Sequence, residues 1–148
     1  MKSSSRDGGH AGVGAFERTA RIRLADTDAS GTLSLGGYAR FCDIVEVEFL
    51  RSLGFAPATF GERDVRMTRV HVEFDFFRGA RFDDVLTIRI SVASVGVHSL
   101  RFNVEIVCGD ALIAESVIVN AFVDGARKSI AIPEDLAQKL RERILVER

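Results

Sequence analysis

The chain has 148 residues, 47% hydrophobic and 28% charged, and its formal net charge at pH 7 is -1. These values predict one domain with a sizeable core, and no apolar run approaches the roughly 20 residues that span a membrane. A net charge this small argues against nucleic acid as the default partner. Residues 1–14 consist mainly of Ser, Gly and charged residues, so we expect a disordered tail before a single domain at residues 15–148.

The composition also argues against a metal or disulfide framework. Only two cysteines occur, Cys42 and Cys108, which suits a reducing, cytoplasmic location. His71 and His98 have no partner at the spacing of metal ligands, so no metal site is expected. A phosphate-binding glycine loop with lysine is absent from the sequence, and we expect no cofactor.

An alternating segment at residues 17–25 begins the ordered part of the chain. Ile22 and Leu24 alternate with arginines there, which is typical of a half-buried strand with both apolar residues facing the core. A short acidic loop at residues 26–31 follows this strand.

The loop leads into the most regular pattern of the chain, between Leu35 and Leu53. Apolar residues at spacings of three and four predict one long helix, capped by Ser34 and ended by Gly54. The predicted core face holds Tyr38, Phe41, Cys42, Val45, Phe49 and Leu53, and Ile44, Val47 and Leu50 lie on the opposite side. The free N–H groups of the first helical turn carry partial positive charge, so a carboxylate just before them lies beside a site that polarises carbonyl oxygens.

The rest of the chain predicts strands at hairpin spacing. Residues 56–68 lack periodicity and are expected to form a loop. Alternating segments follow near residues 70–76, 86–92, 100–106 and 112–123, then a short strand at 127–132 and a helix from Pro133 to about Val146. Gly79 is expected at a bulge. This order predicts an α+β fold, one sheet around one helix, in which dimerisation covers the apolar row of Val117, Val119, Ala121 and Val123.

Four segments carry a resemblance to a known family. They are the loop Asp26-Thr27-Asp28-Ala29-Ser30-Gly31, Tyr38 seven residues beyond it, EFLRSLG at residues 48–54, and FRGARFDDVL at residues 77–86. Together, over about residues 20–133, they resemble the hot-dog fold of the hydroxybenzoyl-CoA and acyl-CoA thioesterases. The resemblance implies an antiparallel sheet wrapped around the long helix and an acyl-CoA thioester hydrolase that forms a homodimer or a dimer of dimers.

The resemblance also implies roles for particular residues. Asp28 matches the family's catalytic carboxylate, as nucleophile or general base, and the N–H groups near Leu35 and Gly36 match those that hold the thioester oxygen. The glycine pair of Gly36 and Gly37 is expected to open space for a bulky acyl group. Further candidates for contact with substrate are Tyr38, the strand residue Ser99, and Arg78, Arg81, Arg127 and Lys128 for coenzyme A phosphates.

Three alternatives remain open from the sequence. The chain is also compatible with a module that binds acyl-CoA without hydrolysing it, or with a thioesterase acting on carrier-protein thioesters. Asp26, Asp28 and Ser30 also fit the first ligand positions of a calcium loop, but Gly37 stands where that loop requires a bidentate Glu.

Overall fold

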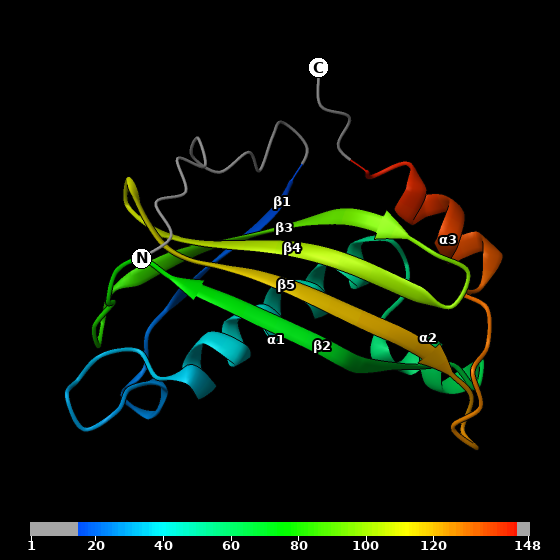
Figure 1. Cartoon of the computed structure of the whole chain (residues 1–148), viewed down its shortest axis with the longest axis horizontal. Coiled ribbons are helices and arrows are strands. Elements are labelled where there is room, and N and C mark those ends of the chain that lie inside the picture. Colours follow the sequence, from blue (N-terminus) through cyan, green and yellow to red (C-terminus); the bar gives the residue numbers. More distant parts are fainter. Residues whose placement is uncertain (1–14, 145–148) are drawn as a thin grey trace.

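The computed structural model describes residues 15–144, so the tail expected at residues 1–14 lies outside the described residues. The strands form one antiparallel sheet in the order β1-β3-β4-β5-β2. They are β1 (Phe16–Arg21), β2 (Arg66–Phe76), β3 (Val85–Val95), β4 (Ser99–Cys108) and β5 (Ala111–Val123). The helices are α1 (Leu35–Ser52), α2 (Pro57–Glu62) and α3 (Glu134–Arg141) (Figure 1).

The long helix α1 lies against one face of this sheet (Figure 1). Ser34 caps it, since the Gly37 N–H donates to Ser34 Oγ, and Gly54 follows it with φ +90°, as predicted. The six predicted core residues are all buried. Leu50, on the opposite side of the helix, is buried as well, because the segment that contains α2 folds over that side.

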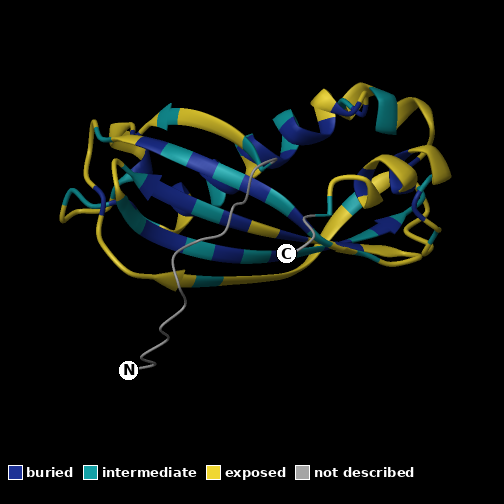
Figure 2. Cartoon of the chain, turned by 90° about the horizontal axis from the view of Figure 1, so that it is seen from above, coloured by how far each residue is buried: buried dark blue, intermediate teal, exposed yellow. Residues whose placement is uncertain are grey.

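The central strands confirm the predicted alternation. Residues of β3, β4 and β5 alternate between buried and more exposed positions, as Figure 2 shows. The inner row includes Ile88, Ile90, Phe102, Ile118 and Phe122, all nearly inaccessible to solvent. These side chains form the core between the sheet and α1, so the helix start is held on a rigid base.

The first strand is shorter than predicted. It ends at Arg21, and a 3-10 turn at Leu24–Asp26 redirects the chain. Ile22 is buried as expected, but Leu24 is 72% exposed, so the prediction that Leu24 faces the core is wrong. Alternating residues point to opposite faces only while the backbone is extended, and at Leu24 the backbone is already in the 3-10 turn.

The segment at residues 56–68 is more ordered than predicted, because it contains α2 and the start of β2. The bulge of β2 lies between Arg69 and His71 and not at Gly79. As one of the two edge strands, β2 leaves Val70, Val72 and Phe76 at 59%, 39% and 52% exposure. The strand expected near residues 70–76 therefore has much of its apolar surface uncovered in one protomer.

The C-terminal segment packs against the far end of the sheet. The strand expected at residues 127–132 is reduced to an isolated bridge between Val123 and Ser129. The helix α3 begins after Pro133 and buries Leu136 and Leu140; it ends at Arg141, and Val146 lies outside the described residues. Within residues 15–144, no helix has both the length and the hydropathy that crossing a bilayer requires.

Candidate active site

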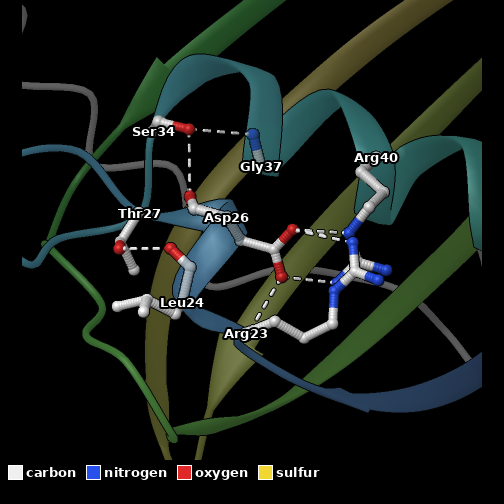
Figure 3. Close-up of polar contacts among 7 residues, drawn as sticks. All are labelled: Arg23, Leu24, Asp26, Thr27, Ser34, Gly37 and Arg40. Carbon is white, nitrogen blue, oxygen red and sulfur yellow. Dashed lines mark hydrogen bonds and ion pairs between the residues drawn. The ribbon is translucent and has the colours of Figure 1, made fainter.

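The acidic loop is anchored by Asp26, which is buried beneath the start of α1 (Figure 3). Arg40 donates from Nε and Nη2 to its two carboxylate oxygens at 2.6 and 2.5 Å, and the Arg23 backbone N–H donates at 2.9 Å. The hydrogen bond from Arg40 is the largest influence and, against the opposing effect of burial, lowers the Asp26 pKa to about 2. Both oxygens are thus occupied by protein donors, which argues against Asp26 as a calcium ligand.

The backbone of Asp26 joins the loop to the helix start. Its carbonyl oxygen accepts hydrogen bonds from the N–H of Ser34 at 2.8 Å and from Ser34 Oγ at 2.9 Å (Figure 3). A Cβ at Gly37 would lie 2.5 Å from that same carbonyl oxygen and 2.5 Å from Leu33 Cδ1. Gly37 therefore permits a close backbone approach and does not open space for an acyl group, contrary to our expectation for the glycine pair.

Asp28 lies two residues further along and is exposed. Its Oδ1 accepts hydrogen bonds from the Ser30 N–H at 2.9 Å and from Ser30 Oγ at 2.5 Å, and Thr32 Oγ1 lies 3.3 Å away. These donors, the Ser30 hydroxyl first, lower the pKa of Asp28 below its usual value. The side chain is therefore a fixed carboxylate at neutral pH.

An open pocket of about 580 Å³ has Asp28 at its wall. Three separated segments line it: the loop, the first turns of α1, and the chain that follows β2. The lining residues are Asp28, Leu33, Ser34, Leu35, Tyr38 and residues 76–79. Tyr38 is buried with its ring 4.8 Å from that of Phe76, so the pocket combines a carboxylate, a helix start and an aromatic wall.

The first helical turn provides hydrogen-bond donors at this pocket. The N–H groups of Gly37 and Tyr38 donate to Oγ and to the carbonyl oxygen of Ser34. The N–H groups of Leu35 and Gly36 have no acceptor within the described part of the chain, which is usual at a helix start. Leu35 lines the pocket and Gly36 follows it, so N–H groups at the start of α1 lie beside the pocket, where the helix end favours negative charge.

Of the predicted binding residues, Tyr38 and Arg78 lie at the pocket, and Arg81 and Ser99 are not among its lining residues. Arg81 is exposed beside the loop, where it pairs with Thr32. Ser99 begins β4 at the opposite end of the sheet from the Asp28 loop (Figure 1). Arg127 and Lys128 follow β5 at that same far end. Within one protomer the structure therefore does not bring these last three to Asp28.

Sequence reasoning missed two features near the site. Phe76 and Phe77, about half exposed, line the pocket. Glu46 is buried in α1, where Arg69 donates to its Oε2 at 2.6 Å, and burial raises its pKa. The spacing could have indicated this burial, because Glu46 lies one helical turn after the core residue Cys42. Burial raises the pKa of the Cys42 thiol to about 12, which argues against a role as a nucleophile.

Known proteins match this arrangement. Residues 22–140 match the family model of the thioesterase-like superfamily. The acyl-CoA thioesterase YbgC of Haemophilus influenzae is 25% identical over 123 residues, which cover 82% of this chain and 90% of the relative. A 1,4-dihydroxy-2-naphthoyl-CoA thioesterase from Synechocystis has a TM-score of 0.79 at 21% identity, covering 87% of this chain and 97% of that one.

A protein from Staphylococcus aureus, solved in complex with CoA, has a TM-score of 0.82 at 14% identity and covers 90% of this chain and 88% of that one. At such identities the two structures establish the fold alone. The match at residues 22–140 contains the Asp28 loop, α1 and four of the five strands. The chain therefore belongs to the thioesterase-like superfamily and is a thioesterase with the hot-dog fold.

Proposed function

We propose that the protein hydrolyses acyl-CoA thioesters, with Asp28 as the acting carboxylate and the N–H groups of Leu35 and Gly36 as oxyanion donors. The observation that carries this proposal is that Asp28 and the start of α1 line one pocket. The acyl-CoA thioesterase that matches most of this chain supports the choice of substrate class.

The chemistry requires a nucleophile at the carbonyl carbon and stabilisation of the negative oxygen that forms there. Donors at a helix start are suited to that oxygen, and one such donor is typically worth about 100- to 1,000-fold in rate. Because its pKa is lowered, Asp28 is ionised at neutral pH and ready to attack or to orient a water. In the first route Asp28 attacks the carbonyl carbon, an acyl anhydride forms as the thiolate leaves, and water then hydrolyses the anhydride to the free acid. In the second, Asp28 accepts a proton from the water that attacks the carbonyl carbon, and the thiolate leaves as the acid forms.

Residues in and beside the pocket fit the two ends of an acyl-CoA. Arg78 offers a guanidinium for a phosphate of coenzyme A, and Arg81 lies exposed next to the loop. Tyr38 and Phe76 offer an apolar wall beside the thioester. The same wall would accept an acyl chain delivered by a carrier protein. Free coenzyme A should inhibit the hydrolysis of an acyl-CoA substrate strongly and that of a carrier-protein substrate weakly, which separates the two substrates.

The test is thiol release from a panel of aryl-CoA, fatty acyl-CoA and carrier-linked thioesters by the native protein and by Asp28→Asn. We expect kcat/KM of the variant to fall by about 100-fold or more, because a positioned carboxylate typically contributes that much. The melting temperature should not change, since the side chain is exposed. Native-like hydrolysis by Asp28→Asn would refute the assignment.

Quenching the enzyme during turnover separates the two routes. Mass spectrometry of the Asp28 peptide should find the added acyl mass if the carboxylate attacks directly, and an unmodified peptide if it orients a water.

A further inference from the structure

A second hollow lies at the end of α1 that is remote from the Asp28 loop (Figure 1). It has a volume of about 440 Å³, and α1, the segment that contains α2, and the start of β2 line it. It shares no lining residue with the Asp28 pocket. We call it the apolar hollow, because its main lining residues are Val47, Leu50, Phe55, Phe60, Val65 and Met67.

One wall of the apolar hollow is a short segment with no buried residue of its own. Residues 56–63, which we call the α2 segment, lie between the buried residues Phe55 and Val65. In the described part of the chain, the backbone hydrogen bonds of the α2 segment all stay within residues 56–65. Only side chains therefore tie it to the rest of the molecule, which is typical of a region that opens at low cost in free energy.

Both ends of the α2 segment have a backbone geometry suited to a hinge. Gly54, just before it, has φ +90°, and Asp64, just after it, has φ +52°. Lys139 Nζ anchors the first end by donating to the carbonyl oxygen of Leu53 at 2.8 Å. The N–H of Gly125 anchors the second by donating to Asp64 Oδ1 at 3.0 Å. Rotation at these two anchored points would move the segment between them as one piece.

Two side chains hold the α2 segment against the hollow. Phe60 lines the hollow, with its ring 5.7 Å from that of Phe55 and 6.5 Å from that of Phe122. Arg63 forms a bidentate ion pair with Asp135 of α3, at 2.9 and 3.0 Å. Among residues 15–144, this pair is the one hydrogen-bonded contact of the segment with another element. Its side chains are 39% and 56% exposed, so the pair is weak enough to open often.

The lining decides what an open hollow would accept. Moving Phe60 outward removes an aromatic wall and leaves aliphatic side chains of α1 and β2 at the entrance. The carboxylate of Glu46 also lines the hollow, but Arg69 donates to its Oε2 at 2.6 Å, and Arg66 lies at the exposed edge. The buried part of a guest must therefore be apolar and uncharged, because a charge there would lose its hydration without an unpaired partner.

We propose that the α2 segment is a lid over the apolar hollow, hinged at Gly54 and Asp64 and held closed by the Arg63–Asp135 ion pair, and that it admits small apolar molecules. Breaking an exposed ion pair changes an equilibrium by about two- to fivefold. The pair should therefore set how often the lid opens, and not whether the chain folds. The inference goes beyond the proposed function, because no residue of the lid lines the Asp28 pocket.

Amide hydrogen exchange measures how often the lid opens. Arg63→Gln and Asp135→Asn should each speed exchange at the Phe60 and Val65 amides about two- to fivefold, because these amides donate only to carbonyl oxygens of the lid. The double variant should exchange no faster than either single variant, since both substitutions remove the same pair. The amides of β4 are the internal reference for global stability and should not change.

Glu134→Gln is the matched control. Like Asp135, Glu134 is in the first turn of α3, and it forms an exposed ion pair with Arg141 that does not involve the lid. This variant should leave exchange at the lid amides unchanged. The proposal would be overturned by latch-pair variants with native exchange, by equal acceleration in β4 or in the control, or by additive effects of Arg63→Gln and Asp135→Asn.

Binding of N-phenyl-1-naphthylamine, a neutral apolar fluorescent probe, tests what the lid admits. In stopped-flow fluorescence, Arg63→Gln should raise the association and dissociation rate constants together, about two- to fivefold, and leave Kd nearly unchanged. A lid changes access to the hollow and not the fit of the guest. Val47→Trp fills the hollow and should weaken binding about tenfold or more. Val97→Trp, at an exposed valine outside the hollow, is its control and should bind the probe as the native protein does.

The probe experiment has clear contrary outcomes. Absence of binding to the native protein, binding that survives Val47→Trp, or rate constants that do not respond to Arg63→Gln would each contradict entry through the lid. Neither experiment involves a thioester, so their results are independent of the role of Asp28.

Discussion

Asp26 and Asp28 are the same residue type two positions apart, yet their burial and their side-chain partners differ. Asp26 is 3% exposed and held by two arginines, whereas Asp28 is exposed and held by hydroxyl and backbone donors. Both have lowered pKa values, so charge state alone does not distinguish them. Burial and position distinguish them. Asp26 holds the loop against α1, and Asp28 lines the pocket formed by that loop and the start of α1.

Asp26→Ala is expected to give the largest change in stability. Removing Asp26 leaves Arg40 without its partner, which in a buried ion pair costs about 3 to 5 kcal/mol of unfolding free energy. Because Arg40 is partly exposed, we expect a loss at the lower end, about 3 kcal/mol. Asp28→Ala is the matched control and should change it by less than about 0.5 kcal/mol. Urea unfolding of both variants measures the difference. Equal losses would mean that the two carboxylates do not divide their roles.

Gly37→Ala tests the contact between the Asp26 loop and α1 from the helix side. Its Cβ would lie 2.5 Å from the Asp26 carbonyl oxygen, so backbone must shift, at a cost of up to about 3 kcal/mol. At Gly36 a Cβ meets nothing closer than 3.9 Å, and Gly36→Ala should be neutral or stabilising by up to about 1 kcal/mol. Melting temperatures of the two variants give the comparison, and a neutral Gly37→Ala would contradict the close approach.

These glycines also show where sequence reasoning stops. The spacing of Tyr38, Phe41 and Val45 predicted α1, because helix periodicity is local to the sequence. The role of Gly37 depends on how closely Asp26 and Leu33 approach it, and no local pattern reports such a distance.

Similar reasons explain the other differences between sequence and structure. Ser99 and Arg81 were candidates by residue type, but strand direction and loop path decide what reaches the pocket. Leu24 satisfied the strand pattern until a 3-10 turn ended the strand. The strand β2 was predicted correctly, but the burial of its residues does not alternate. Whether a neighbour covers Val72 depends on a second chain, which one sequence does not show.

Acid titration separates the two carboxylates by their contributions to stability. The Asp26 pKa is about 2 when folded against a usual 3.8, so its contribution is complete above pH of about 4 and is lost as the pH falls toward 2. That difference corresponds to about 2 kcal/mol. Unfolding free energies of the native protein and Asp26→Asn, measured between about pH 5 and pH 2, should converge by this amount. A constant gap between them would show that the Asp26 carboxylate is not what titrates.

The smallest effect is expected at Asp28, and it concerns activity. The Ser30 hydroxyl is the largest cause of the lowered Asp28 pKa, so Ser30→Ala should raise that pKa. If hydrolysis requires the carboxylate, the acid limb of the kcat/KM profile moves to higher pH, and activity at neutral pH changes little. Thr32→Ala removes a weaker donor and should move the limb less in the same direction. Because Asp28 is exposed, neither change should alter the melting temperature. A shift of the acid limb without a change in melting temperature would assign the titration to Asp28 and not to the buried Asp26.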